Sequence, residues 1–289
     1  MPTFETILCA IDFSEHSRQA LRVARYLADL TASRIVAVHV VEHLLAEGAT
    51  MAGALDQMRA DLSAELTAFV EGEGRSDRIA ATSIEVGEPH EAILSCATER
   101  HAGLIVLGSR GEGGVRKALL GSVAERVLRH AAVPVLAVPG DDQQPGFDGF
   151  TAVQAALAFD GCTDLVLRHA ATLASMLKVP LTLIHVVDPV SNFPQYTNAS
   201  GAAQQARIDE AKNRLEVLAA ALPLERVQTE VRVGQAGERI AETKGGERLL
   251  TVIGTGGDRL LHRAGSTAYR VFSIAAAPVL AIPPAAAHA

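Results

Sequence analysis

Residues 7–13 read ILCAIDF, and a similar run, AALAFDG, occupies residues 155–161. Each is a short apolar segment that ends beside an aspartate, which is typical of a buried strand. The pairing recurs further along the chain, where RIVAVHVVE at residues 34–42 matches PLTLIHVVD at residues 180–188. Such self-similarity indicates that the chain is a tandem repeat of one structural unit.

The spacing between the two copies changes along the chain. Matching Asp12 with Asp160 gives an offset of 148 residues, the strand histidines give 146, and the prolines near the end of each copy give 144. We therefore expect the second copy to be shortened twice, once between Asp160 and His185 and again between Gly254 and Pro278.

A stretch of linker composition, GDDQQPG at residues 140–146, separates the copies. We expect the first domain over residues 1–140, a linker over residues 141–149 and the second domain over residues 150–285.

Short apolar runs alternate with segments of helical period, and this strict alternation indicates a parallel sheet with right-handed crossovers. The expected fold class is α/β, with two tandem Rossmann-like domains, each an open five-stranded parallel sheet with helices on both faces. In the first copy the pattern predicts strands at 5–12, 34–41, 80–86, 103–107 and 135–139, and helices at 15–31, 51–71, 89–101 and 122–131.

Composition narrows the class of protein. Hydrophobic residues make up 48% of the chain and aromatic residues 4%, so small and branched side chains must form the core. The net charge of −7 argues against binding to nucleic acid, which selects basic surfaces. The three scattered cysteines predict neither a disulfide framework nor a zinc site. Without a basic leader or an apolar run of membrane length, we expect a cytoplasmic protein with no membrane partner.

A glycine-rich segment follows the fourth predicted strand. It reads GSRGEGG at residues 108–114, and GS at residues 121–122 opens the last predicted helix of the first copy. Glycine lets a ligand approach the backbone closely, and a helix N-terminus offers free N–H groups to an anion. The segment is not a Walker A loop, because the Gly-Lys-Ser/Thr ending is missing, nor a GxGxxG fingerprint, which follows a first strand.

The same residues also have structural interpretations. Ser122 followed by Glu125 is a capping box, which would make Ser122 a helix N-cap. Asp12, after the first strand, is either a ligand for a base or ribose or a turn-forming carboxylate. His39 and His185 recur at equivalent strand positions and are expected to be hydrogen-bonded structural residues. From the residues alone, the glycine segment is as consistent with a turn as with a phosphate site.

The chain resembles the universal stress protein family in a tandem two-domain arrangement, over nearly its whole length. The pattern G-x2-G-x9-G-S/T is typical of family members that bind ATP, and it is matched by Gly108, Gly111, Gly121 and Ser122. The resemblance implies an adenine nucleotide alpha hydrolase-like fold with ATP or a related adenine nucleotide as ligand. It also implies that Asp12 and the backbone of Val40 contact the adenine, and that Leu107 and Gly108 lie beside the ribose.

For the phosphates, the resemblance implies contacts from Gly111, Gly121, Ser122 and Val123, with Arg110 as a further contact. A magnesium ion would bridge the phosphates, and the sequence shows no dedicated carboxylate cage for it.

The second copy carries similar residue types with a shorter loop. Seven residues separate Gly257 from Gly265, where the first copy has nine between the matching glycines. Because hydrogen bonds to phosphate do not tolerate displacements of several ångströms, we expect a weaker or altered second site. Its residues would be Asp160, Val186, Gly254, Gly257, Gly265, Ser266 and Thr267.

The expected function is that of an adenine-nucleotide-binding regulatory or stress-response switch, with its main site in the first domain. No catalytic residue set is legible, so turnover is not expected. Two alternatives stay open: a slow ATPase or autophosphorylating enzyme, with Ser122 or Ser109 as acceptor, and a nucleotide-independent protein-interaction or chaperone-like module. In the family, terminal strands pair across a two-fold axis, which suggests an intramolecular pseudo-dimer of strands 135–138 and 279–282, with a homodimer as a further alternative.

Overall fold

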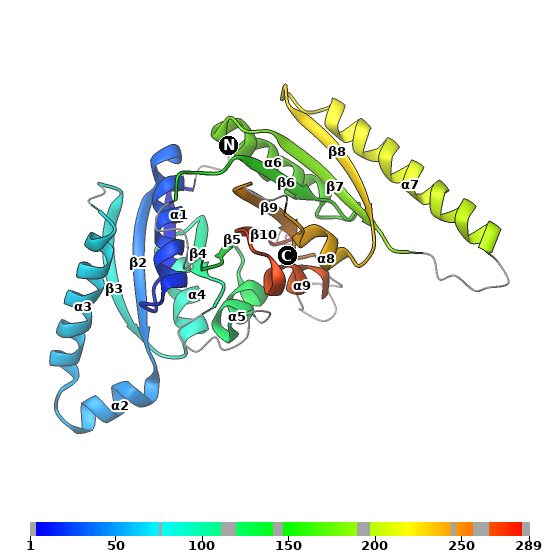
Figure 1. Cartoon of the computed structure of the whole chain (residues 1–289). Helices are drawn as coiled ribbons and strands as arrows, with labels where there is room; N and C mark the ends of the chain where they lie inside the picture. Colours follow the sequence, from blue (N-terminus) through cyan, green and yellow to red (C-terminus); the bar gives the residue numbers. More distant parts are fainter. Residues whose placement is uncertain are drawn as a thin grey trace. The chain divides into compact units, whose positions relative to one another are not determined.

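The computed structural model describes residues 4–74, 77–110, 120–140, 147–189, 197–243, 247–256 and 266–284. The chain divides into two compact units, Met1–Gly149 and Phe150–Ala289. Each unit is a parallel sheet covered by helices (Figure 1), so the predicted tandem α/β fold is confirmed.

In the described part of the first unit, five parallel strands pair in the order β3-β2-β1-β4-β5. The strands are β1 (Thr6–Ala10), β2 (Arg34–Val41), β3 (Ile79–Val86), β4 (Leu104–Gly108) and β5 (Val135–Val138). The helices are α1 (Glu15–Thr31), α2 (His43–Met51), α3 (Leu55–Gly72), α4 (Pro89–Glu99) and α5 (Ser122–His130).

The second unit repeats this topology with the order β8-β7-β6-β9-β10. Its strands are β6 (Ala152–Ala156), β7 (Leu181–Val187), β8 (Val227–Val233), β9 (Leu249–Gly254) and β10 (Val279–Ile282). Its described helices are α6 (Thr163–Leu177), α7 (Thr197–Ala220), α8 (Ala236–Ala241) and α9 (Ser266–Ile274).

The strands are apolar along their whole length because both faces of each sheet are covered. In β1, Ile7, Leu8 and Cys9 are all 0% exposed, although adjacent side chains point to opposite faces. The chain steps one way along the sheet from β1 to β3 and the other way from β4 to β5. Right-handed crossovers therefore place α1 and α3 on one face and α4 and α5 on the other. The reversal lies between β1 and β4, where ligands bind in sheets of this type.

Helix α1 has the bounds that the sequence predicts. Its N-cap is Ser14, whose hydroxyl accepts a hydrogen bond from the Ser17 N–H at 3.2 Å. The apolar stripe that includes Ala20, Leu21 and Ala24 is fully buried against the sheet. The helix starts where a polar cap replaces the strand and follows the 3.6-residue period, so its limits are legible in the sequence.

The start predicted for the helix at residues 51–71 is wrong. The structure has α2 ending at Met51 and α3 beginning at Leu55. Between them Gly53 has φ of 67°, in the left-handed region that glycine adopts without strain. The turn therefore separates two helices where the sequence pattern indicates one.

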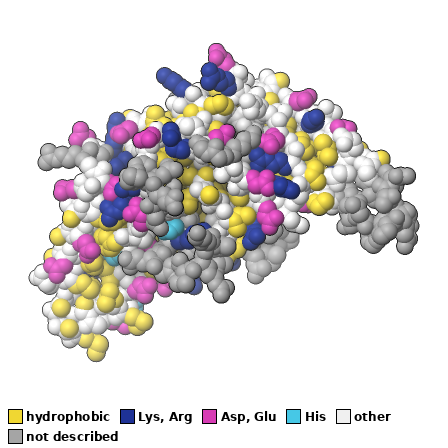
Figure 2. Space-filling view, viewed as in Figure 1, with side chains coloured by type: hydrophobic (Ala, Val, Ile, Leu, Met, Phe, Trp, Pro, Cys, Tyr) yellow, Lys and Arg dark blue, Asp and Glu magenta, His cyan; other side chains and the backbone are white. Residues whose placement is uncertain are grey.

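Helix α2 itself was not predicted, because it buries almost nothing. Ala46 is its one described buried residue, whereas Leu44 is 80% exposed and Met51 is 91% exposed. Figure 2 shows the apolar side chains of this region gathered at the lower left. A helix without a buried stripe gives no helical hydrophobic period from which to infer it.

The described residues include no helix with both the length and the apolar character needed to cross a membrane. Cys9, Cys96 and Cys162 are buried and are not joined in a disulfide. Burial raises the pKa of the Cys9 thiol to about 12, although the nearby charge of Arg25 acts in the opposite direction. Since the thiolate is the reactive form, Cys9 is expected to be inert near neutral pH.

Candidate functional site

The predicted site residues of the first unit that the structure describes gather at the carboxyl edge of its sheet. Asp12 follows β1, Val40 lies near the end of β2, and Leu107 and Gly108 end β4. Strand β1 pairs with both β2 and β4, so these positions lie on three adjacent strands.

The Asp12 carboxylate is anchored by one of its two oxygens. Oδ1 accepts hydrogen bonds from the Ser14 N–H at 3.1 Å and from the Ser14 hydroxyl at 2.5 Å. Oδ2 has no hydrogen-bond partner among the described residues, and Asp12 is exposed. The turn interpretation is therefore correct for Oδ1, while Oδ2 is available to a ligand.

The two strand histidines have a structural role, as expected. His39 Nδ1 donates to the Ile11 carbonyl at 2.8 Å, and its ring centroid lies 4.6 Å from that of Phe13. In the second unit His185 Nδ1 donates to the Leu157 carbonyl at 2.7 Å. Each histidine thus connects the end of the second strand of its unit to the end of the first.

The strand register corrects the alignment of the two copies. Both histidines bond to a carbonyl 28 residues earlier in the chain, so this part of each copy has the same length. Asp12 is therefore equivalent to Ala158, and Asp160 is equivalent to Ser14. The shortening expected between Asp160 and His185 is absent. The sequence match was wrong because Asp160 stands two residues beyond Ala158, the true counterpart of Asp12.

The second expected shortening is confirmed. Strands β4 and β9 end at Gly108 and Gly254, while helices α5 and α9 begin at Ser122 and Ser266. The connection in the second unit is two residues shorter. Gly111, Gly257 and Gly265 lie outside the described residues.

Gly108 packs closely against α1. A Cβ atom at this position would lie 2.8 Å from the Cβ of His16 and 3.0 Å from the backbone carbonyl carbon of that residue. In turn, the Gly140 N–H donates to His16 Nδ1 at 2.7 Å. The ring of His16 thus holds Gly140, two residues after the end of β5, and the close approach of Gly108 to α1 involves no ligand.

The start of α5 corrects the capping-box interpretation. The N-cap is Gly121, with φ of −64° and ψ of 145° and no side-chain cap, and Ser122 is the first helical residue. The carboxylate of Glu125 pairs with Arg129 at 2.5 Å, and the exposed hydroxyl of Ser122 bonds to no described residue. Within the part of the chain that the structure describes, the first N–H groups of α5, including those of Ser122 and Val123, therefore have neither an intrahelical partner nor a side-chain cap.

The loop that precedes α5 begins and ends close to β4. The Gly121 N–H donates to the Ser109 carbonyl at 2.9 Å, and the Ser109 N–H donates to the Val138 carbonyl at 2.8 Å. Arg110, half-buried, comes directly after this anchor. The helix N-terminus is thus held beside the ends of β4 and β5, at the same edge as Asp12.

In the second unit, a cavity of about 320 Å³ lies at the matching edge of the sheet. The predicted residues Asp160, Val186, Gly254 and Thr267 all line it. The volume is near the lower end of the range of about 300–1,000 Å³ that is usual for small-molecule sites. Sequence reasoning missed Ile240 of α8 on its wall, because an aliphatic residue in a short helix carries no functional signal.

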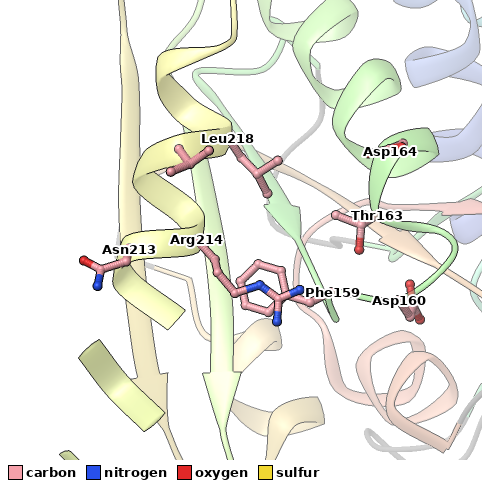
Figure 3. A pocket seen from close by; sticks show the side chains of 8 residues that line it. Phe159, Asp160, Thr163, Asp164, Asn213, Arg214 and Leu218 are labelled. Carbon is pink, nitrogen blue, oxygen red and sulfur yellow. The ribbon is translucent and has the colours of Figure 1, made fainter. Parts of the chain in front are cut away.

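A neighbouring opening of about 460 Å³ lies between the start of α6 and α7 (Figure 3). Arg214 extends from α7 across the ring of Phe159, with its guanidinium carbon 4.1 Å from the ring centroid. The same ring stacks on His185 at 4.3 Å. Asp160 and Thr163 line both this opening and the cavity at the sheet edge.

Comparison with known proteins identifies the family to which this chain is similar. The family model described as the universal stress protein family matches residues 3–139 and 153–283. A universal stress protein of Thermus aquaticus is 36% identical over 140 residues, which is 47% of this chain and 98% of the relative. One from Mycolicibacterium smegmatis is 28% identical over 206 residues, 65% of this chain and 66% of the relative.

Among solved structures, a universal stress protein from Archaeoglobus fulgidus has the same fold, with a TM-score of 0.69 at 21% identity over 96% of both chains. The two family matches cover both units. This chain therefore belongs to the universal stress protein family.

Proposed function

We propose that the first unit binds ATP or a related adenine nucleotide, and that the protein acts as a nucleotide-dependent regulatory or stress-response switch. The observation that carries this proposal is the start of α5, which has a glycine N-cap and whose first N–H groups have no side-chain partner among the described residues. Such an end favours a phosphate through hydrogen bonds and through the helix dipole, which contributes about 0.3–2 kcal/mol.

The remaining predicted residues have complementary roles in this proposal. Asp12 Oδ2 would accept a hydrogen bond from the adenine amino group or the ribose, and the backbone of Val40 would contact the base. Leu107 and Gly108 would lie beside the ribose. Gly111 and Arg110 would reach the phosphates from the loop.

A magnesium ion would be held chiefly by the phosphates. Among the described residues, no three His, Cys, Asp or Glu side chains are grouped so as to hold a metal ion. The ion would neutralise part of the phosphate charge, and the helix N-terminus would orient the phosphates.

Autophosphorylation is a second candidate function, and the exposed, uncapped Ser122 favours it. The hydroxyl is on the first residue of α5, where the proposed phosphates would lie. Incorporation of labelled phosphate from ATP that is lost in Ser122→Ala would support this activity. Equal incorporation in Ser122→Ala would exclude Ser122 as the acceptor.

The proposed function is tested by calorimetric titration of nucleotide-free protein with ATP and magnesium. We expect saturable binding that is at least tenfold weaker in Asp12→Ala, because a hydrogen bond to a charged group contributes about 1.5–3 kcal/mol. Asp56→Ala, which removes an exposed carboxylate from α3, is the matched control and should leave the affinity unchanged. Absence of binding to ATP, ADP and AMP by the parent protein would contradict the proposal.

A further inference from the structure

The described residues that line the cavity at the carboxyl edge of the second sheet carry a single negative charge. Of the described residues that line it, Asp160 is the one Asp, Glu, Lys or Arg. Most of the wall is aliphatic, and it includes Ala156, Ile184, Val186 and Ile253. The described part of the wall therefore offers a carboxylate and no cation to a bound molecule.

Asp160 faces the place where the glycine-rich connection begins. Its Oδ1 accepts a hydrogen bond from the Cys162 N–H at 2.9 Å, at the start of α6. Its Oδ2 lies 3.8 Å from the position that a Cβ would occupy on Gly256, the second residue after β9. In the first unit the equivalent residue is Ser14, which is neutral and buried.

This change alters which ligands the edge can accept. A carboxylate only accepts hydrogen bonds, so it is complementary to a ribose hydroxyl, which donates. Phosphate oxygens are acceptors and carry negative charge, so a neighbouring carboxylate repels them. At the position of Asp160 the first unit has the neutral Ser14, and its own carboxylate, Asp12, lies two residues earlier, so the two edges hold their negative charge at different places.

Thr163 supplies an independent sign of a polar ligand. Its Oγ1 atom is buried and has no hydrogen-bond partner among the described residues, and the residue lines the same cavity. The equivalent residue of the first unit, Ser17, donates its hydroxyl to the Ser14 carbonyl at 2.9 Å. Figure 3 shows Thr163 and Asp160 near each other at the start of α6. Buried polar atoms are nearly always hydrogen-bonded, so a ligand group would satisfy Thr163.

We propose that the cavity of the second unit binds an uncharged purine nucleoside and discriminates against its phosphorylated forms, with Asp160 as the specificity-determining residue. The base and sugar class rests on the proposed function of the first unit, because the two edges share their topology. The aliphatic wall accepts the base, and Asp160 Oδ2 and Thr163 Oγ1 bind the sugar hydroxyls. The volume of about 320 Å³ suits a nucleoside better than a triphosphate.

The proposal is tested by calorimetric titration of the full chain with adenosine and with AMP. Asp12→Ala is present throughout, so that the first site contributes little. We expect one adenosine per chain, with AMP bound about tenfold more weakly. Asp160→Ser, which introduces the residue of the first unit, should weaken adenosine and strengthen AMP. Asp164→Ser removes a neighbouring carboxylate that does not line this cavity, and should leave the ratio of the two affinities unchanged.

Thr163→Val separates a ligand-binding role from a structural one. The variant should bind adenosine severalfold more weakly while its melting temperature stays equal or rises, because an unpartnered hydroxyl has been removed. AMP binding as tightly as adenosine, an affinity ratio that Asp160→Ser does not change, or no adenosine binding would each overturn the proposal.

A parallel titration of the parent protein with ATP distinguishes this proposal from the proposed function. ATP binding that depends on Asp12, without adenosine binding in the second unit, would overturn the nucleoside site alone. Adenosine binding that depends on Asp160, without ATP binding, would overturn the proposed function alone.

Discussion

Replacing Glu73 with alanine is expected to lower the free energy of unfolding of the first unit by about 3 kcal/mol at neutral pH. Glu73 directly follows α3, and its side chain is 9% exposed. Its carboxylate receives Arg18 Nη1 at 2.7 Å and Arg22 Nε at 2.5 Å, both from α1. Removing the carboxylate takes the more buried of two anions from these partly buried guanidinium groups, which keep the more exposed Glu15.

Backbone carbonyl groups at the end of α3 also bind α1 through hydrogen bonds. Arg25, buried in α1, donates to the Glu73 carbonyl at 2.5 Å and to the Val70 carbonyl at 2.6 Å. The end of α3 is thus held to α1 by three arginines. Loss of the carboxylate weakens the attachment that keeps both helices on the same face of the sheet.

The contribution of Glu73 depends on pH with a definite sign. Burial acts to raise the pKa of its carboxyl, but the hydrogen bonds and charges of Arg22 and Arg18 outweigh burial and lower the pKa overall. The stabilisation is therefore present above the ordinary glutamate pKa of about 4.3 and is lost as the pH falls through the lower pKa of the folded state.

Urea unfolding followed by circular dichroism at pH 7 and pH 3 measures this effect, with a separate transition fitted for each unit. We expect the difference between the parent protein and Glu73→Ala to shrink at the lower pH. Glu15→Ala is the matched control, because Glu15 pairs with the same arginines but is 38% exposed. The Glu15→Ala variant should lose less than about 1 kcal/mol of its free energy of unfolding. Equal losses in the two variants, or a difference that does not change with pH, would contradict this account.

The fold was predictable because its signals are local. Buried strands give continuous apolar runs, and α1 gives a cap followed by a helical stripe, so the alternation of strand and helix is legible without tertiary knowledge. Helix α2 was not, because its exposed Leu44 and Met51 form no buried stripe.

The candidate site was predictable in composition but not in all its pairings. Asp160 matches Asp12 by residue type, and only the bonds of the two strand histidines show that Ala158 is the true equivalent. Likewise Ser122 fits a capping motif, but Gly121, which has an extended backbone and whose carbonyl accepts the first helical bond from the Glu125 N–H, is the N-cap. The first error concerns a contact between strands 28 residues apart, which a local pattern does not encode, and the second concerns the backbone angles of Gly121, which the motif does not specify.

Gly108 provides the sharpest contrast between the interpretation from sequence and that from structure. The signature pattern favours a glycine there so that a ligand approaches the backbone, whereas in the structure a Cβ would meet His16. We expect Gly108→Ala to lower the free energy of unfolding of the first unit by about 2 kcal/mol, the usual cost of overpacking. The loss should be present without any nucleotide, because the close contacts are to the Cβ and backbone of α1.

Urea unfolding of the nucleotide-free protein decides between the two explanations. Gly72→Ala is the control, because Gly72 ends α3 and a Cβ there meets nothing within 4 Å. That variant should be neutral or gain up to about 1 kcal/mol from helix propensity. If Gly108→Ala unfolds like the parent protein and only weakens ATP binding, the glycine serves the ligand. If it is destabilised without ligand, this glycine of the signature is required first for packing, and its presence in a sequence does not by itself indicate a nucleotide.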